Sequence, residues 1–158
     1  MNQNTETTSF AIENLTWTDA FLVGFDAIDD THREFVEIVG AMLRGPDTEL
    51  AQHLGELIEH SERHFSQEEE LMRRTAFPAT ECHSNEHAGV LRSMREVLAY
   101  LENGGEVNEA RRLAVELARW FPGHTDYLDA SLGQWAAKKQ LGAVPVVVKR
   151  GMAQHDTD

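Results

Sequence analysis

Two pairs of potential metal ligands, each with its members four residues apart, are the feature that most constrains how this chain can fold. His64 is followed by Glu68, and His83 is followed by His87. Residues four apart lie one turn above each other on the same face of an α-helix. Each pair can therefore direct two donor atoms to one point if its segment is helical. Two such helices facing each other would provide most of a metal site.

Apolar stripes and breaker residues predict four helices, with these pairs on the second and the third. The connections between the helices are short, which implies an all-α fold, an antiparallel up-down-up-down four-helix bundle. The expected starts are caps at Asp29 or Asp30, at Asp47 or Thr48, and at Thr80, with Asn108 beginning the fourth helix. The expected ends are Gly45-Pro46, Phe77-Pro78 and Asn103-Gly104-Gly105.

The chain has 158 residues, which fits one domain with a hydrophobic core. We expect a flexible N-terminal arm over residues 1–16, the four-helix domain over 17–140 and a short C-terminal extension over 141–158. Residues 17–28 lack a helical period and predict a loop laid over the domain. Pro122-Gly123 predicts an interruption and a kink in the fourth helix. Leu141–Val148 has the composition of an extended segment.

Charge and cysteine content exclude several classes of function. The formal net charge is -13, which argues against nucleic acid or anionic membrane as a partner. The single cysteine, Cys82, allows no intrachain disulfide and no thiolate zinc site, and we expect a buried, inert thiol. The N-terminus does not have the pattern of a secretory signal, and no membrane span is predicted. We therefore expect a cytoplasmic protein.

Each predicted helix carries candidate ligands, as in metal sites built in bundle cores. The set contains more donors than one ion can take, but it suits two. With both carboxylates and a solvent-derived group bridging two octahedral ions, one coordination position stays open. An open position beside a second redox metal suits a small diatomic ligand. The candidates are His32, His64, Glu68, His83, His87 and His124, with Asp126 or Asp129.

Helix geometry alone does not decide whether Asp126 or Asp129 is the last of these ligands. A step of five from His124 to Asp129 turns about 140° on an ideal helix, and a step of two to Asp126 turns about 200°. Asp129 is the better of two imperfect choices. Pro122-Gly123 and Thr125 flank His124 and could alter this corner of the site.

Taken together, these motifs resemble those of the hemerythrins, specifically the bacteriohemerythrins, over roughly residues 17 to 135. A single His-x-x-x-Glu or His-x-x-x-His motif is common by chance, whereas several matched segments in the right order are specific. The segments are Trp17 to His32, which includes Val23-Gly24-Phe25-Asp26-Ala27-Ile28, then His64-Phe65-Ser-Gln-Glu68-Glu69-Glu70-Leu-Met72, Phe77-Pro78, His83-x-x-x-His87 and Trp120-x-x-x-His124-x-x-x-x-Asp129.

The resemblance implies a non-haem di-iron centre with an oxo or hydroxo bridge that binds dioxygen reversibly, for carriage, storage, delivery or sensing. Nitric oxide is a further candidate ligand. Glu68 and Asp129 would bridge the irons, one iron taking three histidines and the other two. The implied metal ligands are His32, His64, Glu68, His83, His87, His124 and Asp129.

Two other classes of function remain alternatives to a binding protein. Di-iron oxidases, peroxidases or ferroxidases of the ferritin-like type use Glu-x-x-His motifs, and no histidine near the proposed site has a glutamate three residues before it. This pattern favours reversible binding over an enzyme. A sensor of oxygen, nitric oxide or redox state is usually joined to a signalling domain, for which the chain has no room.

Four other residues near the motifs have open or ordinary interpretations. Glu69 and Glu70 are expected to form a solvated charged face. His60 lies one turn before His64, where the family has no ligand, so it is either structural or at the entrance of the site. Trp120 either lines the ligand pocket or belongs to the core.

Overall fold

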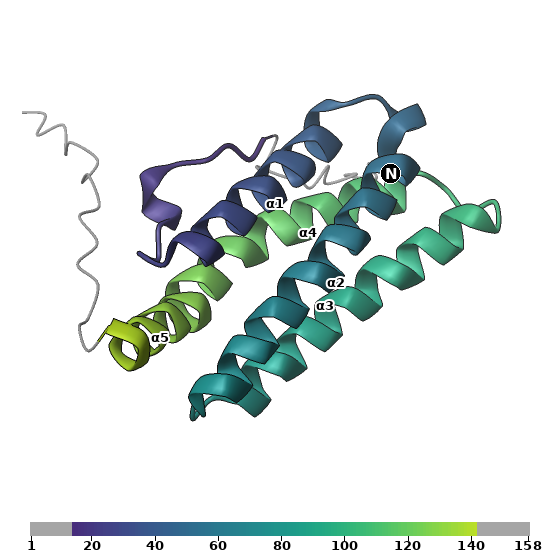
Figure 1. Ribbon diagram of the computed structural model, residues 1–158. Coiled ribbons are helices and arrows are strands. Elements are labelled where there is room, and N and C mark those ends of the chain that lie inside the picture. Colours follow the sequence, from purple (N-terminus) through teal and green to yellow (C-terminus); the bar gives the residue numbers. More distant parts are fainter. Residues whose placement is uncertain (1–13, 142–158) are drawn as a thin grey trace, which may run out of the picture.

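The computed structural model describes residues 14–141, and four long helices in them form an antiparallel up-down-up-down bundle (Figure 1). The predicted all-α fold is thereby confirmed. The helices are α1 (Asp26–Arg44), α2 (Leu50–Thr75), α3 (Thr80–Glu102) and α4 (Asn108–His124), followed by a π-helical turn (Thr125–Asp129) and α5 (Ala130–Leu141). Short 3₁₀ turns span Asp19–Phe21 and Asp47–Glu49.

Two apolar clusters lie at different heights of the bundle, and on α1 and α2 the candidate ligands fall between them. The larger cluster joins α1, α2, α3 and α4, and the smaller one joins the start of α1, the end of α2 and α5. Full burial of a leucine or phenylalanine side chain contributes roughly 2 kcal/mol, so both ends of the bundle are held by packing. The larger cluster includes Phe35, Val39, Met42, Leu54, Leu57, Met94, Leu117 and Phe121, and the smaller one is Val23, Ile28, Leu71, Met72, Leu132 and Ala136.

The start of α1 differs from the prediction. The helix begins at Asp26, and no side chain caps it. Asp29 lies inside the first turn, and its carboxylate accepts hydrogen bonds from the backbone N–H of Val23 at 2.8 Å and of Gly24 at 3.2 Å. Gly24 has a φ of 81°, which suits glycine and turns the chain into the helix. The predicted cap at Asp29 or Asp30 is therefore wrong, because Asp29 satisfies the preceding loop.

The predicted caps of α2 and α3 are also wrong, although these helices begin close to the expected residues. The Asp47 carboxylate accepts a hydrogen bond from Arg111 of α4 at 2.7 Å, and Arg111 also donates to the carbonyl of Gly45 at 2.6 Å. The Thr80 hydroxyl donates to the carbonyl of Phe77 at 2.6 Å. Asp47 thus binds α4 and Thr80 binds the preceding turn, and neither side chain caps its helix.

The last long helix runs through the predicted interruption. Pro122 lies inside α4, and the α-helical geometry extends to His124. The backbone departs from α-helical geometry at residues 125–129, where it forms the π-helical turn. The expected break at Pro122-Gly123 is therefore wrong by a few residues.

Residues 17–25 form the predicted loop, whereas residues 26–28 belong to α1. Trp17 and Phe21 pack on the larger apolar cluster, and the Phe21 ring lies 5.0 Å from that of Phe121. The carbonyl of Leu15 crosses α1 at Gly40, where an added Cβ would lie 2.5 Å from it. A glycine inside this helix thus allows the segment to approach closely. Of the arm expected over residues 1–16, residues 1–13 lie outside the described residues, and so do residues 142–148 of the extended segment expected over 141–148.

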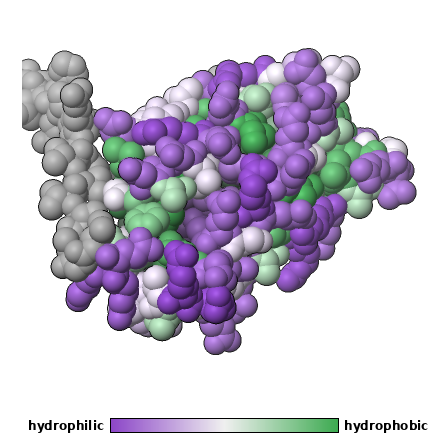
Figure 2. Space-filling view, in the orientation of Figure 1, coloured by the Kyte–Doolittle hydropathy of each residue, from purple (hydrophilic) through white to green (hydrophobic). Residues whose placement is uncertain are grey.

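Hydrophilic side chains dominate the face shown in Figure 2, with small hydrophobic patches between them. Among the described helices, none combines the length and the apolar character that a membrane crossing requires. Cys82 is exposed on α3, so its predicted burial is wrong.

Candidate metal centre

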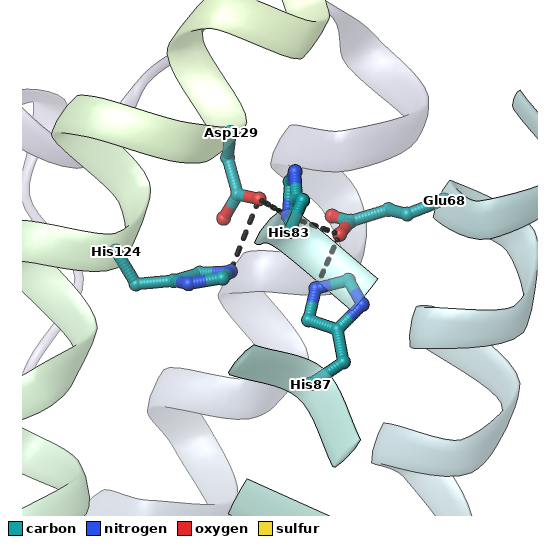
Figure 3. Close-up of side chains that lie close together, drawn as sticks. All are labelled: Glu68, His83, His87, His124 and Asp129. Carbon is teal, nitrogen blue, oxygen red and sulfur yellow. Dashed lines mark ion pairs between the residues drawn. The ribbon is translucent and has the colours of Figure 1, made fainter. Parts of the chain in front are cut away.

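The structure brings five imidazoles and two carboxylates together inside the bundle, and all seven side chains are buried. Every long helix contributes at least one of these side chains, as the sequence predicted. Figure 3 shows the part of the cluster in which Glu68 and Asp129 approach from opposite sides. The seven are His32 on α1, His64 and Glu68 on α2, His83 and His87 on α3, His124 on α4 and Asp129 at the end of the π-helical turn.

The two oxygens of Glu68 face different histidines. Its Oε1 lies 2.8 Å from Nε2 of His64 and 3.8 Å from Nε2 of His32. Its Oε2 lies 3.1 Å from Nε2 of His87 and 3.4 Å from Nε2 of His83. The carboxylate therefore stands between two groups of imidazoles.

Asp129 divides its oxygens in the same way. Its Oδ2 lies 2.9 Å from Nε2 of His32, whereas Oδ1 lies 3.0 Å from Nε2 of His83 and 3.2 Å from Nε2 of His124. Both carboxylates thus separate a two-histidine side from a three-histidine side. The two-histidine side contains His32 and His64, and the three-histidine side contains His83, His87 and His124.

The π-helical turn brings Asp129 into this cluster. The backbone N–H of Ala130 donates to the carbonyl of Thr125, five residues back. In this geometry residues five apart approach the same face, unlike in an α-helix, so His124 and Asp129 both point inward. Asp126 lies on the surface, and Asp129 is fully buried. Thr125 is also buried, and its hydroxyl makes no hydrogen bond.

The polar atoms of the cluster fit a bound cation. Both oxygens of Glu68 and of Asp129, and Nε2 of His83, His87 and His124, are buried without a hydrogen bond. Each such atom costs about 1–3 kcal/mol if left without a partner. The oxygens and nitrogens converge, with donor atoms within 4.8 Å of one another in each group. Imidazole with carboxylate is a donor set suited to iron among other transition metals.

In the absence of a metal ion, the carboxylates and imidazoles of the cluster stabilise each other's charged forms. Burial and the Asp129 carboxylate both act to raise the pKa of Glu68, but the imidazoles of His64 and His83 outweigh them and keep that pKa below its usual range. Burial acts to lower the pKa of His83, yet the Asp129 and Glu68 carboxylates raise it to about 9. His83 is therefore protonated at neutral pH in the metal-free protein, and a metal ion would displace this proton.

An outer carboxylate orients one imidazole of the three-histidine side. Oε1 of Glu86 lies 2.9 Å from Nδ1 of His124 and accepts a hydrogen bond from the indole Nε1 of Trp120 at 2.8 Å. A carboxylate only accepts, so Nδ1 of His124 carries a proton, and Nε2 is the ring atom that faces Asp129. Trp120 stacks on the His124 ring with centroids 4.2 Å apart. Trp120 thus supports a histidine of the site.

Sequence reasoning gave Glu86 no role. The residue lies directly before His87, but its partners are on α4, so only the packing of α3 against α4 makes the contact. The one signal in the sequence that points to this contact is Trp120, which lies one turn before His124.

His87 has a different environment from His124. The ring of Phe65 stacks on its ring with centroids 3.9 Å apart. Glu69 Oε1 lies 3.7 Å from its Nδ1, so Glu69 does not belong only to a solvated face. Glu70 pairs with Arg73 on the surface, as expected for that position.

Among residues 14–141, no such outer carboxylate contacts a histidine of the two-histidine side. Nδ1 of His32 and Nδ1 of His64 are buried and make no hydrogen bond. The His64 ring instead has the buried His60 ring beside it, at a centroid distance of 5.7 Å. A pocket of about 50 Å³ lies next to His64 and Glu68, lined also by Phe25, Ala27, Ile28, Thr31, Gln67 and Leu71.

Comparison with known proteins agrees with this arrangement. The family model of the hemerythrin HHE cation binding domain matches residues 23–136. The chain belongs to the hemerythrin family. The resemblance predicted from the motifs is thereby confirmed.

Several hemerythrins are similar to the chain over most of their length. A bacteriohemerythrin of Ralstonia nicotianae is 33% identical over 78% of this chain and 89% of its own. A bacteriohemerythrin of Stenotrophomonas maltophilia is 26% identical over 81% of this chain and 90% of its own. A myohemerythrin of Sipunculus nudus is 29% identical over 56% of this chain and 72% of its own. No solved structure matches significantly.

Proposed function

We propose that this hemerythrin binds dioxygen reversibly at a di-iron centre held by the seven buried side chains. The observation that carries the proposal is the division of both carboxylates between two groups of histidines. Each carboxylate offers one oxygen to each side, which is the arrangement of bridging ligands. In this assignment His83, His87 and His124 would hold one iron, His32 and His64 would hold the other, and Glu68 and Asp129 would be shared by both.

The two-histidine side has one imidazole fewer, so an ion held there would have room for a small ligand. When bound, two irons joined by an oxo or hydroxo bridge supply the redox chemistry of reversible dioxygen binding. The pocket next to His64 has a volume of about 50 Å³, which suits a small diatomic molecule. Its walls include the apolar side chains of Phe25, Ile28 and Leu71, which limit the access of water. Nitric oxide would fit the same pocket.

We propose a binding protein and not an enzyme, because imidazoles outnumber carboxylates among the ligands. Neutral imidazoles donate less negative charge than carboxylates, so the donor set disfavours the high-valent iron that oxygen-activating enzymes use. Both carboxylates of the cluster face imidazoles and so serve as ligands. We place the function in the cytoplasm, since the chain has one cysteine and no disulfide to maintain.

The test is metal analysis combined with visible absorption during anaerobic reduction and re-exposure to oxygen. The expected result is about two irons per chain and a coloured oxygenated form that disappears and returns over repeated cycles. Irreversible conversion to an oxidised form with consumption of oxygen would favour an enzyme. One zinc ion, or no bound metal, would contradict the site assignment.

A further inference from the structure

A second group of potential ligands lies outside the metal centre, in a groove between α1 and α2. The groove has a volume of about 360 Å³. Four carboxylates and a single guanidinium line it, so its field attracts cations. The lining residues are Glu34, Glu37 and Ile38 of α1 with Glu56, Glu59, His60 and Arg63 of α2.

His60 distinguishes this groove from an ordinary acidic surface. Its side chain is only 4% exposed, and neither ring nitrogen makes a hydrogen bond. Nδ1 lies 3.1 Å from Oε2 of Glu34, but the pair lacks hydrogen-bond geometry. An imidazole beside a carboxylate is a pair of ligands for a divalent cation.

The groove connects to the metal centre through a row of imidazoles. The ring centroids of His60 and His64 are 5.7 Å apart, and those of His64 and His32 are 5.2 Å apart. Nδ1 of His64 is also buried without a hydrogen bond. From the groove inward, His60, His64 and Glu68 therefore follow one another one helical turn apart on α2.

We propose that this groove is the loading site of the metal centre, where His60 and Glu34 first hold a divalent cation before it passes along His64 to Glu68. The inference rests on the proposed function, because it needs a buried site that binds metal. Among the described residues, clusters of three or more close donor atoms occur at the buried site but not in the groove. An ion held by two protein ligands leaves readily, and the buried carboxylates and imidazoles retain it.

The rate at which the metal-free protein takes up Co²⁺ tests this proposal. Stopped-flow absorbance would follow binding to the imidazoles, and metal analysis after desalting would give the final content. The test variants are His60→Gln and the double variant E34Q/E59Q. The matched control is E62Q/E96Q, which removes two carboxylates from the groove between α2 and α3. All four positions of the double variants are exposed, so both should fold.

The expected result is uptake slowed roughly 3- to 10-fold in E34Q/E59Q, with the control close to wild type. His60→Gln should slow uptake as well, and thermal unfolding checks that it folds. Should it unfold, the double variants still decide the question. Unchanged rates in E34Q/E59Q, or equal slowing in both double variants, would overturn the loading site while the proposed function stands. If the wild-type protein retains no Co²⁺ at all, the proposed function fails as well.

Discussion

The two sides of the metal centre share their carboxylates but differ in what surrounds their histidines. On the three-histidine side, Glu86 fixes His124 at 2.9 Å, and Phe65 stacks on His87. On the two-histidine side, Nδ1 of His32 and Nδ1 of His64 lack hydrogen bonds, and a pocket lies beside His64. A carboxylate at Nδ1 orients an imidazole and makes it a stronger ligand. The comparison teaches that neighbouring side chains hold the imidazoles of one side in place, whereas the other side has free space beside it.

The largest effect on metal binding is expected from a substitution of Glu68, whose carboxylate the two sides share. Glu68→Gln replaces one of the two carboxylate oxygens with an amide NH2 group, so the charged side chain shared by both sides is lost. Metal content should fall from about two ions per chain to less than one. Removal of an outer contact should have a smaller effect, since it typically lowers metal affinity roughly 10- to 100-fold. Metal analysis after desalting measures this. The control is Glu70→Gln on the surface, and loss of only one ion would contradict the bridging role.

Two variants that each remove one histidine, one from either side, should differ in how much metal they retain. His64→Ala leaves the two-histidine side with a single imidazole, whereas His87→Ala leaves the three-histidine side with two. We expect about one ion per chain in His64→Ala and a content closer to wild type in His87→Ala. The same metal analysis, with thermal unfolding to check the fold, compares them. Equal losses in the two variants would remove the distinction between the sides.

The stability of the metal-free protein should depend on pH through the three-histidine side. The pKa of His83 is raised to about 9 in the folded protein, against 6.5 for an ordinary histidine side chain. Its contribution is therefore fully present below about pH 6.5 and is lost as the pH rises through about 9. The carboxylates raise the pKa of His124 as well.

We expect the free energy of unfolding to fall by up to about 3 kcal/mol over this range. Urea unfolding of the metal-free protein at several pH values measures it. His83→Gln should show a much smaller fall. The metal-loaded protein should not show this fall either, since bound metal has already displaced the proton. A constant stability from pH 6.5 to 9 in the metal-free wild type would contradict the charge arrangement.

The smallest effect is expected at the outer contacts. Glu86→Gln weakens the acceptor of His124 Nδ1 and Trp120 and should lower metal affinity on the three-histidine side by roughly 10-fold, with 100-fold as the upper range. Competition with a chelator measures the affinity. The matched variant is Glu69→Gln, whose carboxylate lies 3.7 Å from His87 Nδ1 and should matter less. If both variants bind equally well, the difference between the sides does not depend on Glu86.

Much of the fold could be predicted because its signals are local in the sequence. The apolar stripes and the breakers at Gly45-Pro46 and Asn103-Gly104-Gly105 indicated the bundle, since helix periodicity depends on neighbouring residues. The caps were less predictable. Asp29, Asp47 and Thr80 are all suitable capping residues, but each binds another part of the chain. Which partner such a side chain takes depends on what the fold brings near it.

The sequence by itself determined that four helices form and that His64 with Glu68, and His83 with His87, lie on one face each. A spacing of four is sufficient for this, because one helical turn is a property of the backbone. The tertiary structure decided the remaining features. A π-helical turn, absent from any ideal-helix argument, brings Asp129 and not Asp126 inside.

Contacts between helices decided the rest of the site. Glu86 meets His124 across 38 positions of sequence. His60 meets Glu34 across the groove between α1 and α2. Such pairs depend on how whole helices pack, and helix packing results from the summed burial of many apolar side chains and not from any local motif.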